Sequence, residues 1–190
     1  MKTPDLVFRG RRLSSDRALV LAAVESLPAA RAAVADGADL VSFAGASAVS
    51  SVEQARAAFP DLVIGVDTAD PSAAEACCEA GADLIVARAD LAEIAARYGA
   101  GYAAPAVPSV PGLSVVVDIG EFRTMPPGEV PVLASVAGDG TPGGLALAAL
   151  AASAGVTIIS TKHVRGVRHA AEMAASIAGT RPPAKAVRWE

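Results

Sequence analysis

Short apolar runs alternate regularly with alanine-rich segments along this chain. Each run is rich in β-formers, follows a Gly-Ala pair or a proline, and precedes a segment with helical start signals, which is typical of βαβ units. The sequence at 36–41 is echoed at 80–85, roughly two units of 22 residues later. We count eight predicted strands, at 18–24, 38–44, 62–68, 83–87, 101–106, 114–119, 131–137 and 156–161.

Eight such units in 190 residues predict an α/β fold of the compact (β/α)8, or TIM-barrel, class as a single domain, 1–190. Residues 1–15 are expected to form a plug or hairpin before the first strand. Barrels of this class commonly take about 250 residues, so the βα loops must be curtailed. Segments 107–113 and 121–130 are rich in Pro and Gly and short, which predicts incomplete fifth and sixth helices.

The alternative is a doubly wound open sheet. No predicted strand is followed by Gly-x-Gly-x-x-Gly, and 138–144 lacks the lysine of a phosphate loop. The barrel is therefore the preferred prediction.

Composition excludes several classes of partner. The chain is 53% hydrophobic, carries a formal charge of −4 and scatters its basic residues, so nucleic acid is not an expected partner. Uncharged stretches at 98–117 and 141–161 are interrupted by Pro and Gly, and 1–12 has no continuous apolar segment. We therefore expect a cytoplasmic protein without a membrane partner.

Adjacent Cys77 and Cys78 fit neither a disulfide framework nor a metal site, and no cofactor or metal is predicted.

Chemistry in a barrel lies at the carboxyl ends of the strands, whereas residues that open a strand, such as Asp39 and Asp83, serve stability. The predicted carboxyl ends carry several charged and polar side chains that form a candidate site. They are Glu25, Ser47, Asp67 with Thr68, Arg88, Asp118 with Glu121, Asp139, and Lys162 with His163.

The segments 37–41, 63–68 with 71–85, 115–118 and 156–165 resemble, in this order along the chain, the dihydropteroate synthase family of pterin-binding barrels. Val63-Ile-Gly-Val-Asp-Thr68 and the following 71–85 are similar to its third strand and helix, with the Asp-Thr signature; 37–41, 115–118 and 156–165 are similar to its second, sixth and last strands. The resemblance implies that Asp67 and Asp118 bind the aminopyrimidine edge of a pterin, whose adjacent N–H donors suit a carboxylate. The alternatives are a loop acceptor for Asp67 and a solvated pair with Glu121 for Asp118.

The chain also departs from that family. It contains no asparagine, and the family's two asparagines would fall near Glu25 and Val86. The family's Ser-Arg-Lys and Arg-x-His signatures would fall on 137–139 and 160–162, which leaves Lys162 as a remaining cation. Glu25 would repel a diphosphate by like charge, and lysine cannot reproduce bidentate phosphate recognition. Arg88 and His163 are further candidate residues of the mouth.

The expected function is a degenerate, dihydropteroate synthase-like protein that binds a pterin-like ligand and lacks, or is impaired in, synthase activity; no catalytic residue is predicted. One alternative is a functioning transferase of folate biosynthesis that joins a dihydropterin diphosphate to 4-aminobenzoate, with Lys162 and Arg88 rebuilding the anion site. A second is an unrelated TIM-barrel lyase that uses Lys162, buried in the barrel mouth, as a Schiff-base amine.

Two helices carry predictions about packing. Residues 145–154 are apolar around the whole helix, which predicts a homodimer or pairing with a related chain through this face. In the final helix, 164–178, Val167, Met173 and Ile177 are expected to face the barrel.

Overall fold

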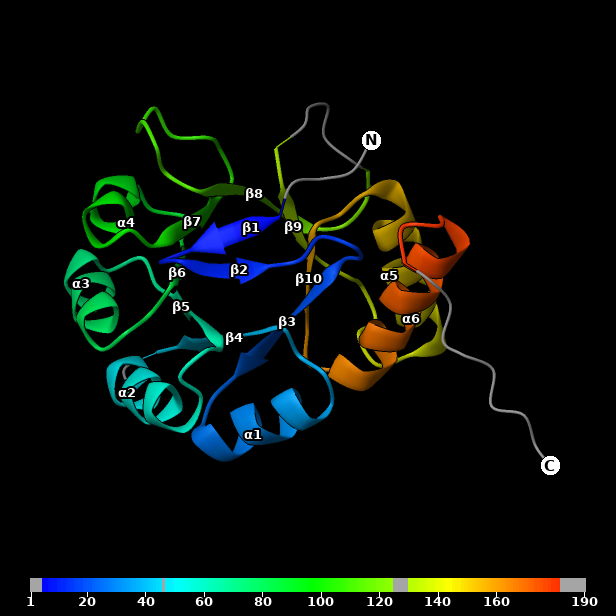
Figure 1. The fold of residues 1–190 in the computed structure, drawn as a ribbon, viewed down its shortest axis with the longest axis horizontal. Coiled ribbons are helices and arrows are strands. Elements are labelled where there is room, and N and C mark those ends of the chain that lie inside the picture. Colours follow the sequence, from blue (N-terminus) through cyan, green and yellow to red (C-terminus); the bar gives the residue numbers. More distant parts are fainter. Residues whose placement is uncertain (1–4, 46, 125–129, 182–190) are drawn as a thin grey trace.

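A computed structural model of the chain describes residues 5–45, 47–124 and 130–181. Eight parallel strands form a closed barrel in which each strand pairs with the next in the chain and the last pairs with the first (Figure 1). Closure confirms the predicted barrel and excludes the open sheet. The strands are β3 (Leu19–Val24), β4 (Leu40–Ala44), β5 (Val63–Asp67), β6 (Leu84–Val86), β7 (Gly101–Ala104), β8 (Val115–Glu121), β9 (Val132–Ser135) and β10 (Ile158–Thr161).

Six helices of the described chain surround this barrel. They are α1 (Leu27–Ala35), α2 (Ala48–Ala58), α3 (Pro71–Glu79), α4 (Ala92–Tyr98), α5 (Pro142–Ala154) and α6 (Val164–Ile177). No helix follows β7 within 105–114, and the described residues after β8 are not helical either, while 125–129 lie outside the described residues. The predicted gaps at the fifth and sixth helices are confirmed over these segments. In the described residues no helix has both the length and the apolar character that crossing a membrane requires.

A hairpin of β1 (Leu6–Phe8) and β2 (Arg11–Leu13) closes the amino end of the barrel. Phe8 is fully buried, and its ring lies against Gly101 at the start of β7. A Cβ at position 101 would stand 2.1 Å from the Phe8 ring, so only glycine admits the plug here.

The inward-facing side chains change in size along the barrel axis. Near the plug they are large and aliphatic and form one buried cluster with Leu6 and Phe8, including Leu21, Leu40, Val63, Leu84, Leu133 and Ile158. Because side chains alternate between the two faces of a strand, the next inward residues lie two positions further along. Several of these are small, namely Ala23, Ser42, Gly65, Ser135 and Ser160. A hollow therefore forms at the carboxyl end.

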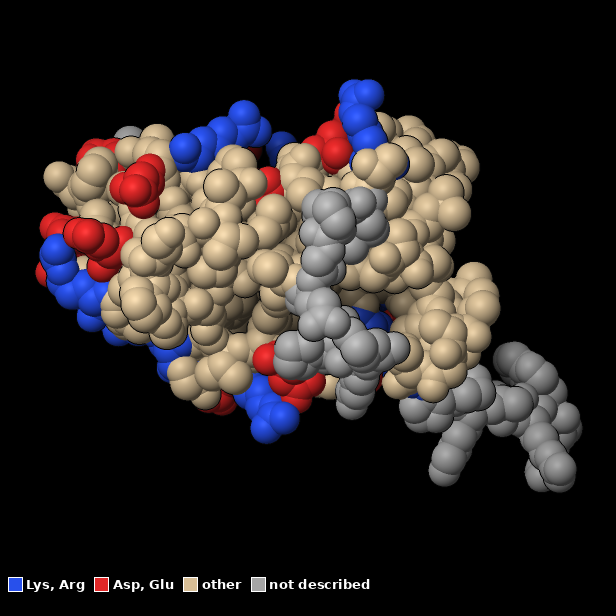
Figure 2. Space-filling view, turned by 90° about the horizontal axis from the view of Figure 1, so that it is seen from above, with Lys and Arg blue, Asp and Glu red and all other residues tan. Residues whose placement is uncertain are grey.

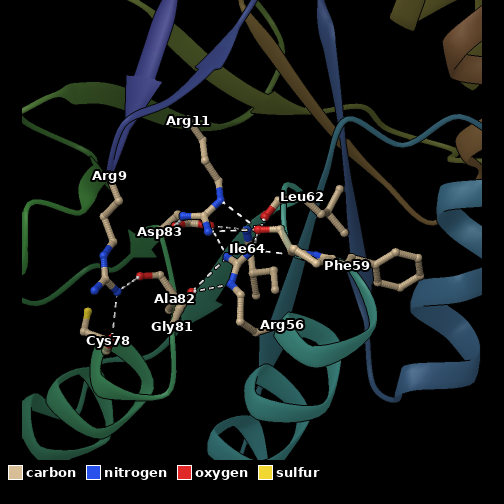
Figure 3. Close-up of polar contacts among 11 residues, drawn as sticks. Arg9, Arg11, Arg56, Phe59, Leu62, Ile64, Cys78, Gly81, Ala82 and Asp83 are labelled. Atoms are coloured by element: carbon tan, nitrogen blue, oxygen red, sulfur yellow. Dashed lines mark hydrogen bonds and ion pairs between the residues drawn. The ribbon is translucent and has the colours of Figure 1, made fainter.

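Two acids at the strand starts, Asp83 and Asp39, hold the amino end together, and Figure 3 shows the contacts of Asp83. Asp83, with a fully buried side chain, accepts hydrogen bonds from Arg11 (2.6 Å), from Arg56 and from the Ile64 backbone N–H (3.0 Å). Asp39 repeats the arrangement, accepting from the Val20 backbone N–H (2.8 Å) and from Arg17. These contacts match the predicted structural role of the strand-opening acids.

The outer faces of α5 and α6 carry exposed apolar side chains. Leu150 is 60% exposed on α5, and Met173 and Ile177 are 65% and 82% exposed on α6. The prediction that Met173 and Ile177 face the barrel is wrong: α6 packs through Val167 and small side chains such as Ala171, because alanines permit a close approach. Figure 2, which views the molecule from the top of Figure 1, shows a broad uncharged area between charged side chains at the margins.

Candidate functional site

A pocket of about 330 Å³ opens at the carboxyl ends of the strands, where the inward side chains are small. Every barrel strand except β7 contributes to it, either directly or through the residues that follow the strand. Five of the six residues predicted for binding or for the mouth line this one pocket: Glu25, Asp67, Arg88, Asp118 and Lys162. We call this cavity the mouth pocket.

Asp67 is the last residue of β5, and its side chain makes no hydrogen bond or ion pair with other described residues. Burial raises the pKa of its carboxyl group, and the negative charge of Asp118 raises it further, while Arg88 acts in the opposite direction. The alternative interpretation of Asp67 as a loop acceptor finds no contact among the described residues. Its oxygens are available to a ligand that donates hydrogen bonds.

Asp118 stands where β8 becomes irregular. The pairing of β8 with β9 shifts register between Asp118 and Glu121, and bulges of this kind often re-aim a side chain next to a site. The Asp118 carboxylate accepts one hydrogen bond from the Gly120 backbone N–H (2.9 Å). Glu121 instead forms an ion pair with Arg123 (3.2 Å), whereas Asp118 lines the mouth pocket.

The cations of the mouth are solvent-exposed. Arg88 and Lys162 line the pocket, and neither side chain makes a hydrogen bond or ion pair within the described part of the chain. The lyase alternative expected a buried amine, and the structure contradicts that expectation for Lys162. His163 is also exposed and does not line the mouth pocket; its ring lies against Gly140.

Asp139 follows β9 and contacts the end of β10. Its carboxylate accepts hydrogen bonds from Thr161 Oγ1 (2.5 Å) and from the Lys162 backbone N–H (2.6 Å). The acid therefore ties the segment after β9 to the end of β10. A side chain engaged in this way is an anchor for the backbone and adds no positive charge to the mouth.

Sequence reasoning missed Ser42, which lines the mouth pocket from β4. Its side chain is buried, with 6% exposure, and its hydroxyl has no hydrogen-bond partner among the described residues. The available signal was a polar residue at an inward position of an otherwise apolar strand. Among the described residues no group of His, Cys, Asp and Glu side chains is placed to hold a metal ion.

Comparisons with known proteins place this geometry in context. No family model matches the chain. The protein named inactive dihydropteroate synthase 2 of Mycobacterium tuberculosis is 34% identical in an alignment of length 129 that covers 48% of this chain and 41% of that relative. This match therefore spans about two fifths of the relative's length. The protein of the same name from Mycobacterium leprae is 28% identical over 94% of this chain and 97% of its own.

Solved structures agree with these relatives. Mycobacterium tuberculosis Rv1207 is 28% identical with a TM-score of 0.78, covering 95% of this chain and 99% of that structure. Yersinia pestis dihydropteroate synthase, at 19% identity, shares the fold with a TM-score of 0.76 over 94% of this chain and 100% of its own.

Proposed function

Because this chain is a dihydropteroate synthase-like barrel in shortened and degenerate form, we propose that it binds a pterin-like ligand and lacks synthase activity. The observation that carries the proposal is the pair of carboxylates, Asp67 and Asp118, that share the mouth pocket. Two nearby carboxylates favour a ligand that presents several N–H donors, and hydrogen bonds to a charged acceptor are about twice as strong as neutral ones.

A pterin supplies such donors on its aminopyrimidine edge. The Yersinia pestis enzyme has been solved with a pterine-sulfa conjugate, and the Burkholderia cenocepacia synthase with 7,8-dihydropteroate. Those complexes support a pterin-type ligand for the related pocket here.

The proposed loss of turnover follows from the anion side of the pocket and from its cover. Glu25 lines the mouth, where its negative charge opposes a diphosphate. The chain has no asparagine, and Asp139 is engaged in holding β10. The loop between β3 and α1 is also short, because α1 begins directly after Ser26, so this loop excludes little water from the mouth. Relatives named as inactive are consistent with this proposal.

The test is calorimetric titration of the purified protein with a dihydropterin and, separately, with its diphosphate. We expect the dihydropterin to bind, and Asp67→Asn or Asp118→Asn to weaken it by about tenfold or more, because each removes a charged acceptor. Asparagine keeps the size of the side chain and, at position 118, an oxygen for the Gly120 N–H.

Glu121→Gln is the matched control, since this carboxylate stands on the same strand and pairs with Arg123. It is expected to leave the dissociation constant within about twofold of wild type, a change near the size of a surface ion pair. The diphosphate is expected to bind no more tightly than the dihydropterin. Formation of dihydropteroate in a coupled assay with 4-aminobenzoate would instead support the functioning transferase.

We further propose that the exposed apolar face of α5 pairs with a second copy or a related chain, and that the protein is cytoplasmic. Leu150 lies on this face, and α5 carries no charged residue. Cell fractionation with a tagged chain checks the location, and a membrane-bound fraction would contradict it.

A further inference from the structure

The floor of the mouth pocket contains a polar group that the fold leaves unused. Ser42 is 6% exposed, and its Oγ atom makes no hydrogen bond within the described residues. A buried hydroxyl without a partner is costly, and most such groups in native structures bond to protein, water or a ligand. Ser42 is also one of the residues that line the mouth pocket, so its buried hydroxyl lies in the wall of this cavity.

The neighbouring strands show why the fold supplies no partner. Ser42 pairs with Ala23 on β3 and with Gly65 on β5. The methyl group of Ala23 cannot form a hydrogen bond, and Gly65 has no side chain. A Cβ built on Gly65 would stand 3.3 Å from Ser42 Oγ, closer than an ordinary contact. Glycine thus keeps open the space that adjoins the hydroxyl.

The strand register places Ser42 below the carboxylates. On the neighbouring strands Ala44 pairs with Asp67, and Ser42 pairs with Gly65 two positions nearer the plug. Leu21 and Leu133, which belong to the buried aliphatic cluster, line the same part of the pocket. A molecule that enters between Asp67 and Asp118 therefore meets aliphatic groups and the serines Ser42, Ser135 and Ser160. Of these, Ser42 has the buried hydroxyl without a partner among the described residues.

We propose that Ser42 is a ligand-binding residue at the floor of the mouth pocket, where its hydroxyl pairs with a polar atom at the inner end of the bound molecule. A serine hydroxyl both donates and accepts, so it fits a ring nitrogen or a ring carbonyl. The carboxylates select donor groups, and the floor selects a flat ring that carries a polar atom at its far side. This inference rests on the proposed pterin pocket and adds to it a residue that discriminates ring ligands from simple cations.

The test compares Ser42→Ala with Ser135→Ala in calorimetric titration with a dihydropterin. Ser135 lines the same pocket, but its hydroxyl already donates to the Gly120 carbonyl (3.3 Å), which makes it a matched control. We expect Ser42→Ala to weaken binding by about fivefold to tenfold, the size of one neutral hydrogen bond, and Ser135→Ala to change it by less than about twofold.

Thermal unfolding of the free proteins separates binding from folding. Ser42→Ala removes an unpaired buried hydroxyl, so the midpoint is expected to stay or rise, whereas Ser135→Ala removes a bonded one and is expected to lower it. Guanidinium ion, titrated as a simple donor-bearing cation, is expected to bind wild type and Ser42→Ala equally.

The outcomes distinguish the two proposals. If wild type binds the dihydropterin and Ser42→Ala binds it equally well, the role of Ser42 is overturned while the pterin pocket stands. If wild type does not bind the dihydropterin, the proposed function fails and the inference fails with it. A loss of affinity in Ser42→Ala that comes with a lowered unfolding midpoint would indicate a structural role and would also overturn the inference.

Discussion

The carboxyl group of Asp67 sits where ionisation is unfavourable. Burial and the charge of Asp118 both raise its pKa above the ordinary value of 3.8. A carboxyl group whose pKa is higher in the folded chain than in the unfolded one stabilises the fold only while it is protonated. That contribution is complete below the unfolded pKa and is lost as the pH rises through the folded pKa, so ionised Asp67 opposes folding at neutral pH.

Asp67→Asn is therefore expected to stabilise the free protein at pH 7, raising the unfolding midpoint by about 1–2 °C, and to give no gain near pH 3, where both states are protonated. Circular dichroism melts at the two pH values check this. Glu121→Gln is the control and should show no comparable gain, because its carboxylate pairs with Arg123 at the surface. Equal gains at both pH values would show that the effect of Asp67→Asn is not electrostatic.

The raised pKa of Asp67 also affects how ligand binding depends on pH. If Asp67 accepts ligand donors as a carboxylate, dihydropterin affinity should fall with acid at a higher pH than for an ordinary carboxyl group, because the raised pKa brings protonation earlier. The residue thus combines a cost to folding with a proposed role in binding, a combination often found at functional sites.

Among the elements, the β1–β2 hairpin packs against the barrel at a position, Gly101, that has no side chain. Gly101→Ala would place a Cβ 2.1 Å from the Phe8 ring, and overpacking a core commonly costs about 1–3 kcal/mol. We expect that loss of unfolding free energy in urea denaturation.

Two further variants make this prediction specific. Gly143→Ala in α5, where an added Cβ meets no atom closer than 3.8 Å, should be neutral or slightly stabilising. Phe8→Ala combined with Gly101→Ala should cost less than the sum of the two single changes, because the smaller side chain removes the clash. If the losses of unfolding free energy in the two single variants simply add in the double variant, Phe8 and Gly101 are not in contact.

The same elements show what the sequence could predict. Apolar runs and Gly-Ala pairs predict the strand positions, and the location of Asp39 and Asp83 at strand starts predicts the structural role that their contacts show. The outward face of α6 was not predictable from side-chain size, because its alanines pack more closely than Met173 and Ile177 could. Ser42 was missed because a lone polar residue inside a strand gives no information about whether its hydroxyl is bonded.

At the scale of the whole molecule, the contacts that hold the fold and the residues that line the mouth lie at opposite ends of the barrel. The plug, Asp39 and Asp83 act at the amino end, while Asp67, Asp118 and the small inward residues lie at the carboxyl end. Substitutions at the mouth therefore leave the main ion-pair anchors intact. This separation explains how a chain without the asparagines that the family resemblance implies still closes an eight-stranded barrel.

The last property of the whole molecule is its assembly. Leu150 is 60% exposed on a helix with no charged residue, and its burial between two copies would favour association. We expect light scattering at tens of micromolar to give the mass of two chains for wild type and of one chain for Leu150→Glu, because the introduced carboxylate would be desolvated at the interface. Val107→Glu is the control. Val107 is 55% exposed on the segment after β7, away from α5, and this variant should keep the wild-type mass. A wild-type mass of one chain across the concentration range would contradict pairing of identical copies. If a related chain added to that monomer then formed a complex that Leu150→Glu abolishes, the α5 face would be assigned to a heterologous partner.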